Sequence, residues 1–281
     1  MPDAAPDPIT LIPKQRRCAV LHGEEFHVAS CWRAVLAEVG LSAGSDWAEL
    51  ARQPAAEVVT GSASATCYRV LSADGSVLYA KHEVYAPKDQ LKHWLRPART
   101  TIEAYAYGRI HAAEIPAAKV LAWGERRRMG CPTESLIVTL AVPDTLDLRR
   151  FVTGPWAAMS AADKRESYQQ IAAQLAEQLK RAHAMGFVHH DLKWRNVLIQ
   201  RTADGFLPVW IDAPRGAVWR WRAARRPIVD LGDLAPSSLD LTSVYDRMRF
   251  VCRYLGKKRS PGDASRLYRR IAARVGRRGI G

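Results

Sequence analysis

The fold is decided by His-His-Asp-Leu-Lys-Trp-Arg-Asn-Val-Leu-Ile, residues 189–199. Its first half is polar and charged, which is typical of a loop, and its apolar end predicts a β-strand. Upstream, apolar side chains recur about every four residues after Ser160, so we expect a long helix that ends at Met185-Gly186. The chain therefore runs from a helix through a polar loop into a strand.

A second strand follows directly. Ala203-Asp204-Gly205 separates the first strand from residues 207–213, and Asp-Gly between two β-rich segments predicts a hairpin. With the Asp-Gly pair at the centre of the turn, Asn196 lies opposite Ala213 and next to Asp212. The mouth of the hairpin is thus expected to carry an amide and a carboxylate side by side.

Two further charged residues, Asp191 and Lys193, lie on the loop that enters this hairpin. Oxygen ligands from Asn196 and Asp212, with a third carboxylate and a lysine beside them, suit Mg²⁺ and a phosphate group better than zinc. A plainer alternative is a solvated polar loop whose Asp and Asn residues only stabilise turns.

The same residues resemble the catalytic loop of the protein-kinase superfamily, His-Arg-Asp-x-x-x-x-Asn followed by an apolar strand. The resemblance implies that Asp191 is the catalytic base that orients the acceptor hydroxyl. It implies that Lys193 neutralises the transferred phosphoryl group, and that Asn196 and Asp212 hold Mg²⁺.

The chain before Pro143 has a different pattern, in which short β-rich runs surround one helix and predict a small, mostly antiparallel sheet. The strands are expected at 57–60, 66–72, 76–82, 117–124 and 134–142, and the helix at 100–113. Residues 24–52 show short helical patterns, and roughly the first 20 residues are expected to form a loose arm.

In the same resemblance, Lys81 matches the strand lysine that binds nucleotide phosphates, and Glu103 matches the helix glutamate that pairs with it. Each has an alternative. Lys81 could be an edge-strand lysine that faces water, and Glu103 could complete a capping box with Thr100. Glu83 is a weaker rival for the partner of the lysine.

The same resemblance implies the remaining nucleotide contacts. Gly61 is the one glycine in the segment that would cover the phosphates, where protein kinases have three. Thr139, Leu140 and Ala141 would form the hinge whose backbone meets the adenine, and Pro143 would begin the crossing between lobes. ATP and Mg²⁺ are the implied cofactors.

Over residues 58–254 the chain resembles the bacterial lipopolysaccharide kinase family, which phosphorylates Kdo or heptose in the inner core. The pieces that carry the resemblance are YAKH, residues 95–125, the catalytic loop, WIDAPRG and residues 240–255. Three residues differ from the protein-kinase pattern: His190 replaces the arginine of the loop, and Ala213 and Pro214 replace the Phe-Gly that follows the metal-binding aspartate.

The family resemblance implies a two-lobed, protein-kinase-like α+β fold. We expect an extension at 1–55, a small N-terminal lobe with a mostly antiparallel sheet and one helix at 56–143, and a larger, mainly helical lobe at 144–281. It also implies work at the cytoplasmic face of the inner membrane. Two alternative functions remain. The first is a protein kinase or a phosphotransferase that acts on a soluble small molecule, and the second is a non-catalytic kinase-like binding module.

Charge and composition agree with a polyanionic partner. Lys and Arg total 42 against 28 acids, a formal net charge of +14. Residues 215–226 hold five arginines, Trp219 and Trp221 without an acid, and residues 249–278 hold eleven basic residues against Asp263. Such segments suit a lipid-linked sugar acceptor or an anionic membrane surface. A solvated helix face and, less favoured, a nucleic-acid patch are the alternatives.

Composition also excludes several classes of protein. A chain that is 48% hydrophobic and 25% charged is neither disordered nor collagen-like. The first residues lack the pattern of a secretory signal, so we expect a cytoplasmic protein. The five cysteines are scattered without the close pairs of a zinc or redox site. The oligomeric state is not predicted.

Overall fold

The computed structural model describes Pro13, Cys18 and residues 20–221, 223–238, 241–256 and 260–278. The expected loose arm therefore lies almost entirely outside the described residues. The chain divides into two compact units: a first unit of residues 1–108 and 118–141, and a second unit of residues 109–117 and 142–281.

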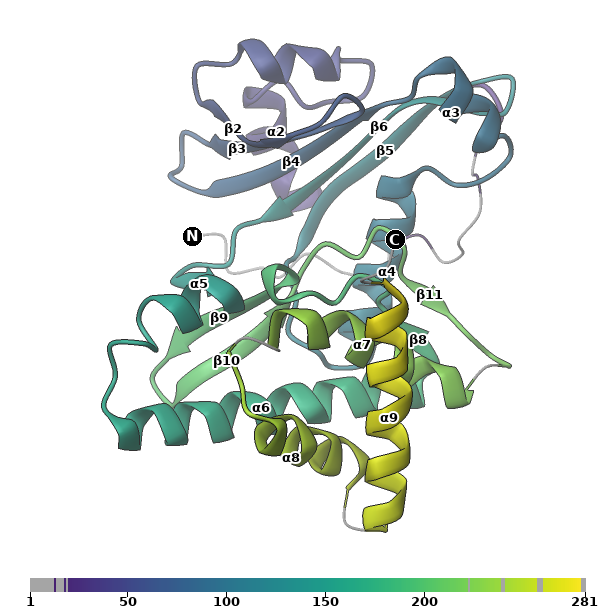
Figure 1. Cartoon of the computed structure of the whole chain (residues 1–281). Coiled ribbons are helices and arrows are strands. Elements are labelled where there is room, and N and C mark those ends of the chain that lie inside the picture. Colours follow the sequence, from purple (N-terminus) through teal and green to yellow (C-terminus); the bar gives the residue numbers. More distant parts are fainter. Residues whose placement is uncertain are drawn as a thin grey trace. The chain divides into compact units, whose positions relative to one another are not determined.

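The first unit is built on a six-stranded antiparallel sheet in the order β1-β5-β6-β4-β3-β2 (Figure 1). Its strands are β1 (Gly23–Val28), β2 (Ala56–Gly61), β3 (Ala65–Leu71), β4 (Val77–Val84), β5 (Val120–Arg128) and β6 (Cys131–Leu140). The five expected strands are present.

Strand β1 is a correction, because helical patterns were expected from residue 24 onward. Its sequence, GEEFHV, hides a period of two: Phe26 and Val28 pack on the apolar core, while Glu25 pairs with His27 on the other face. This polar segment is a strand because it pairs with β5, and the local sequence does not predict that pairing.

The rest of the extension is helical, as expected, with η1 (Ser30–Trp32), α2 (Arg33–Glu38) and η2 (Trp47–Arg52). Leu36, Trp47 and Leu50 are fully buried and share one core with apolar residues of β3, β4, β5 and β6. Leu78 and Ala80 of β4 face this core, so Lys81 lies on the opposite face of the sheet.

Two helices accompany the sheet where one was expected. The expected helix is α4 (Arg99–Ala112), and the additional one is the short α3 (Pro87–Lys92). Pro87 stands in the first turn of α3, where its missing N–H is tolerated, so a residue that usually breaks helices begins one here.

The second unit is mainly helical (Figure 1). Its helices are α5 (Leu148–Thr153), α6 (Ala161–Ala184), α7 (Arg226–Ser238), α8 (Val244–Leu255) and α9 (Pro261–Arg278), with the 3₁₀ turns η3 (Trp194–Asn196) and η4 (Ala223–Arg225). Its strands are β7 (Thr145–Asp147), β9 (Val197–Thr202) and β10 (Gly205–Trp210) in one sheet, and β8 (Phe187–Val188) with β11 (Ala217–Val218) in another.

Helix α6 begins and ends as its sequence predicts. The Ser160 hydroxyl accepts a hydrogen bond from the Asp163 amide, and Gly186 just beyond the helix has a φ of 80°. None of the helices in the described part of the chain combines the length and apolar character needed to cross a membrane.

Candidate active site

The hairpin that was expected to carry the site is present with a different register. Thr202 pairs with Gly205, so Ala203 and Asp204 form the centre of the turn instead of Asp204 and Gly205. Asn196 consequently lies opposite Ile211, whose amide donates to the Asn196 carbonyl at 3.0 Å, and not opposite Ala213. A shift of two residues keeps every side chain on its face, and Asp212 still follows the paired position directly.

Tertiary contacts with α6 explain this register. Gln170 donates to the carbonyl of Asp204 at 2.8 Å and accepts from the amide of Phe206 at 3.1 Å. One and two turns further along the helix, Gln174 and Gln178 donate to the carbonyls of Phe206 and Pro208 at 3.0 and 2.8 Å. The three glutamines occupy the same face of α6. Their spacing of four was the sequence signal that could have revealed this attachment.

The catalytic loop gathers three of the expected residues. Asn196 Nδ2 donates to the backbone carbonyl of Asp191 at 2.8 Å and to its Oδ2 at 3.2 Å. Lys193 Nζ lies 2.6 Å from Asp191 Oδ1, and Arg195 Nη2 lies 3.7 Å from Oδ2. The Asp191 carboxylate is therefore held in one orientation by an amide and two cations.

A residue that sequence reasoning missed, Asp230 of α7, holds the loop from behind. Its fully buried carboxylate accepts the amides of His189 and His190, both at 3.0 Å. His183 Nε2 lies 3.1 Å from Asp230 Oδ2, and its Nδ1 lies 2.9 Å from the hydroxyl of Tyr254. Burial alone would raise the pKa of Asp230, but the hydrogen bonds and charge of the histidines lower it below its usual value.

His189 connects the loop to the residue before Asp212. It is fully buried, its Nε2 lies 3.1 Å from the carbonyl of Ile211, and its ring meets Trp210 edge-on. Burial lowers the pKa of His189 and thereby favours the neutral ring. The charge of Asp230 acts in the opposite direction but is the smaller effect.

Asp212 has left-handed backbone geometry, with a φ of 58°. An aspartate in this region is uncommon, and the neighbouring residues hold it there. The amide and carbonyl of Ile211 are both hydrogen-bonded, and Ala213 is fully buried and accepts the amide of Gly216 at 3.0 Å.

The donor set at this hairpin suits magnesium. Among the residues that the structure describes, no three His, Cys, Asp or Glu side chains gather as a metal cluster. Mg²⁺ needs no such cluster, because it binds through one or two carboxylates and completes its shell with water and substrate phosphates. Asn196 Nδ2 is committed to Asp191, so the Asn196 Oδ1 atom is the one that a cation can use.

In the first unit, Lys81 Nζ lies 2.9 Å from Oε2 of the buried Glu103. Helix α4 already begins at Arg99, so Thr100 is inside it and the alternative capping role of Glu103 is not what the contacts show. The rival Glu83 accepts a hydrogen bond from Tyr85 at 3.0 Å.

The other expected nucleotide contacts lie at the edges of the first unit. Gly61 is exposed at the end of β2, beside a turn in which the Ser62 amide donates to the Ala65 carbonyl at 2.8 Å. In the expected hinge, Thr139 pairs with Tyr79, and the amides of Leu140 and Ala141 donate to carbonyls of the same unit at 2.9 Å. These two amides are therefore already used within the first unit.

The expected site residues fall into two groups. Lys81, Glu103, Gly61 and the hinge belong to the first unit, and the structure joins the first two in an ion pair. The catalytic-loop residues and Asp212 belong to the second unit, where the β9–β10 hairpin brings them together.

Comparisons with known proteins give the family. The model of the lipopolysaccharide kinase (Kdo/WaaP) family matches residues 60–254. A solved structure described as WaaP in complex with acyl carrier protein has a TM-score of 0.66 at 21% identity and covers 90% of this chain and 97% of that chain, so it shows the same fold. Another, Rad53 1–466 in complex with AMP-PNP, has a TM-score of 0.44 at 20% identity and covers 66% of this chain and 46% of that one. No curated protein sequence matches. Because the family model spans most of its length, this chain belongs to the lipopolysaccharide kinase (Kdo/WaaP) family.

Proposed function

We propose that this protein transfers the γ-phosphoryl group of ATP to a hydroxyl of heptose or Kdo in the inner core of lipopolysaccharide. Family membership makes it a phosphotransferase. The observation that carries the finer proposal is the Asp191 carboxylate, held by Asn196 and faced by Lys193 at 2.6 Å. A carboxylate beside a lysine can orient a hydroxyl and balance the charge of the phosphoryl group it receives.

Each residue has one task in this reaction. Lys81, oriented by Glu103, binds the phosphates of the nucleotide. Asp191 orients the acceptor hydroxyl and takes its proton while the new P–O bond forms and the bond to ADP breaks. Asn196 and Asp212 would hold Mg²⁺, which supplies charge neutralisation at the phosphates when it is bound.

The test uses purified protein with labelled ATP and core lipopolysaccharide from which phosphate has been removed. We expect the wild-type protein to label the core sugar and Asp191→Asn to lose the transfer. Asp163→Asn, at the exposed start of α6, is the matched control and should keep it. Equal labelling of peptides or free sugars would favour the rival soluble-substrate kinases, and no transfer with ATP bound would favour a binding module.

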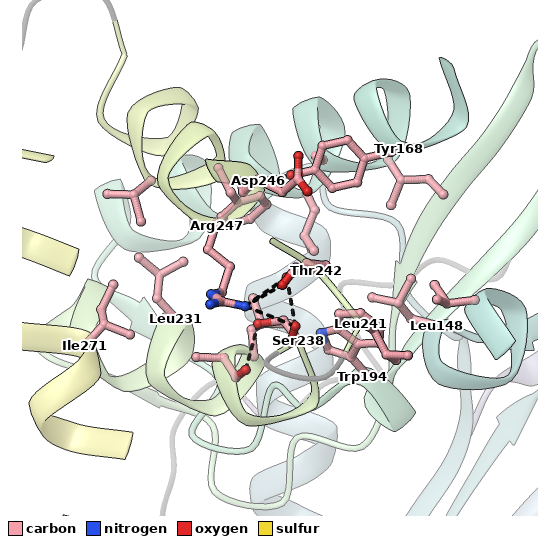
Figure 2. Close-up of a pocket in the computed structure, with 18 of the residues that line it drawn as sticks. Leu148, Tyr168, Trp194, Leu231, Ser238, Leu241, Thr242, Asp246, Arg247 and Ile271 are labelled. Carbon is pink, nitrogen blue, oxygen red and sulfur yellow. Dashed lines mark hydrogen bonds between the residues drawn. The ribbon is translucent and has the colours of Figure 1, made fainter. Parts of the chain in front are cut away.

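A second function is suggested by an apolar cavity of about 150 Å³ in the second unit (Figure 2). Its walls come from α5, α6, α7, α8 and α9, with Leu148, Leu231, Leu241 and Ile271 among the lining side chains. Two charged residues, Asp246 and Arg247, also line the cavity, and Arg247 donates to the Thr242 carbonyl at 2.6 Å. The apolar walls of the cavity suit a hydrocarbon chain.

We propose that this cavity takes the acyl chain of an acyl carrier protein, since a protein with which this chain shares its fold was solved with such a partner. The cavity also reaches the catalytic loop, because one of its lining residues is Trp194. In the sequence Trp194 follows Lys193 directly and precedes the buried Asn196 by two residues. An occupant would therefore pack against the segment that carries Asp191.

A fluorescent fatty acid and an acyl carrier protein with and without its acyl chain serve as probes. Ala172→Leu would fill part of the cavity, and Ala161→Leu, on the exposed start of the same helix, is the control. We expect Ala172→Leu, and not Ala161→Leu, to weaken the binding of both the fatty acid and the acylated carrier protein. Equal binding of acylated and unacylated carrier protein would contradict the proposal.

We also propose that the loop before α7 meets an anionic membrane surface. Trp221 is 93% exposed, and the exposed Arg220 and Arg225 flank it. Two residues of this basic segment have other roles. The ring of Trp219 packs against the ring of His190, with 4.8 Å between the ring centroids, and Arg226 donates to the His183 carbonyl at 2.9 Å. Arg222 lies outside the described residues.

Sedimentation with anionic vesicles tests this surface. Replacing Arg220 and Arg225 by Ser should release the protein, because each basic residue near such a surface contributes about 1 kcal/mol. Replacing the exposed Arg149 and Arg165 by Ser removes the same charge elsewhere and should not. Equal loss in both variants would contradict a defined membrane surface.

A further inference from the structure

Buried carboxylates line up on the sheet face that carries Lys81. Glu125 of β5 and Glu83 of β4 are both in register with Ser135 of β6, and all three are buried. Glu25 of β1 continues the row beside Glu125. Carboxylates in such a place require hydrogen-bond donors or cations, so their partners must be found in the structure.

The partners are at the start of helix α4. Glu125 Oε2 accepts the amide of Ala98 at 3.0 Å and the hydroxyl of Thr101 at 2.7 Å. The amide of Arg99 donates to the hydroxyl of Tyr85 at 2.9 Å, and that hydroxyl donates to Glu83 at 3.0 Å. The first amides of a helix lack partners within the helix, and here side chains of the sheet supply them.

A buried arginine fixes Glu125 from the other side. Arg127 Nε lies 2.6 Å from Glu125 Oε1, and both side chains are completely buried. Arg127 also donates to the carbonyl of Gly130 at 2.7 Å and to the carbonyl of Arg96. We call Glu125, Arg127, Tyr85, Glu83 and Thr101 the α4 latch.

Tyr85 suits its part in the latch. Its hydroxyl must donate to one group while it accepts from another, so it has to keep its proton. Burial, together with the neighbouring Glu83 charge, raises the pKa of Tyr85 well above its ordinary value. The hydroxyl of Tyr85 therefore keeps its proton even in moderately alkaline solution, and it can donate to Glu83 while it accepts from the Arg99 amide.

We propose that the α4 latch is a positioning device for Glu103. Glu103 follows Arg99 by about one turn of α4, so fixing the first turn to the sheet fixes the height and rotation at which Glu103 meets Lys81 on the same sheet. In this protein the ion pair is therefore built into the first unit. The inference rests on the proposed role of Lys81 and Glu103 in nucleotide binding.

Substitutions at Thr101 and Tyr85 test the latch without leaving a buried charge unpaired. Thr101→Val removes one hydroxyl and keeps the shape, and Thr101→Ser restores the hydroxyl. Tyr85→Phe removes the other hydroxyl. We expect Thr101→Val/Tyr85→Phe to lower kcat/KM for MgATP at least about tenfold, because the variant removes two hydrogen bonds to charged groups, those to Glu125 and Glu83. The KM for the sugar acceptor should stay unchanged, and Thr101→Ser should stay near wild type.

A double-mutant cycle separates positioning from general loss of stability. In a Glu103→Gln background the latch substitutions should have almost no further effect on kcat/KM, because the group they position is gone. Glu134→Gln, which weakens partly buried contacts with His82 and Arg126 away from α4, should lower the melting temperature without changing kcat/KM. Full additivity of latch and Glu103 substitutions would overturn the inference.

Hydrogen exchange gives a readout that is independent of activity. Amides at the start of α4 should exchange faster in the latch variant than in Glu134→Gln at equal stability. The two levels of proposal fail differently. If Lys81→Met keeps full activity, the proposed nucleotide role is wrong. If Lys81→Met is inactive but the latch variant matches wild type in exchange and kinetics, only the latch inference is wrong.

Discussion

Asp230→Asn should loosen the catalytic loop from behind while leaving Asp191 and Lys193 intact. The buried carboxylate accepts three N–H groups, from the backbone of His189 and His190 and from the ring of His183. An asparagine keeps one acceptor oxygen but turns an NH₂ group toward a donor on the other side. Each hydrogen bond to a charged group contributes about 1.5–3 kcal/mol, so we expect a loss of about 3 kcal/mol or more.

The assay is urea unfolding followed by tryptophan fluorescence, with turnover measured on the folded fraction. In thermal unfolding of a chain of 281 residues, a loss of about 3 kcal/mol lowers the melting temperature by about 5 °C, since the unfolding entropy is about 2.1 cal/mol/K per residue. Turnover should fall while the chain is still folded, because the peptide bonds around His190 lose their anchor. Asp163→Asn is the control at an exposed cap. A variant within 1 kcal/mol of wild type, with normal turnover, would refute the reasoning.

Three further predictions follow from the same site. Asp191→Ala should lower turnover by about 10² or more with nucleotide binding retained; unchanged turnover would remove Asp191 from its proposed role. Because burial lowers the pKa of His189 in the folded state, its contribution to stability is complete above the unfolded pKa of about 6.5 and is lost as the pH falls below it, by up to about 1.4 kcal/mol per pH unit. Urea midpoints from pH 5 to pH 8 should show this slope in the wild type and less of it in His189→Gln, and equal slopes would contradict it. Gly186→Ala should cost about 1–2 kcal/mol, because Gly186 has a φ of 80° and an added Cβ would lie 3.3 Å from the carbonyl oxygen of Trp219; an unchanged melting temperature would show that the turn adapts.

The parts of the site that could be predicted are those encoded locally. A polar loop between a periodic helix and an apolar strand, followed by a turn signal, places Asn196 near Asp212 in both the expected and the observed register of the hairpin. The error of two residues in that register came from Gln170, which determines where the turn forms and belongs to another element.

Residues that act across long stretches of chain were not predictable in this way. Asp230 lies on a helix well beyond the catalytic loop, and nothing in its neighbourhood distinguishes it from Asp233, which is also buried. In the sequence, Glu125 is one of several charged residues at the end of a strand. Its contact with the start of α4 could not be predicted, because only the folded sheet brings the two together. Strand β1 was missed for the same reason.

The packing of residues before position 60 on the sheet has a practical consequence for expression. A shortened protein cut to the family match, 60–254, would lack Leu36, Trp47 and Leu50, which fill one face of the sheet, and would lack α9 with its buried Leu267 and Ile271. Each cut would expose a contiguous apolar surface, and such surfaces drive proteins into inclusion bodies. A protein truncated at the limits of the family match is therefore not expected to fold into a soluble fragment. A soluble fragment must begin before β1 and continue through α9.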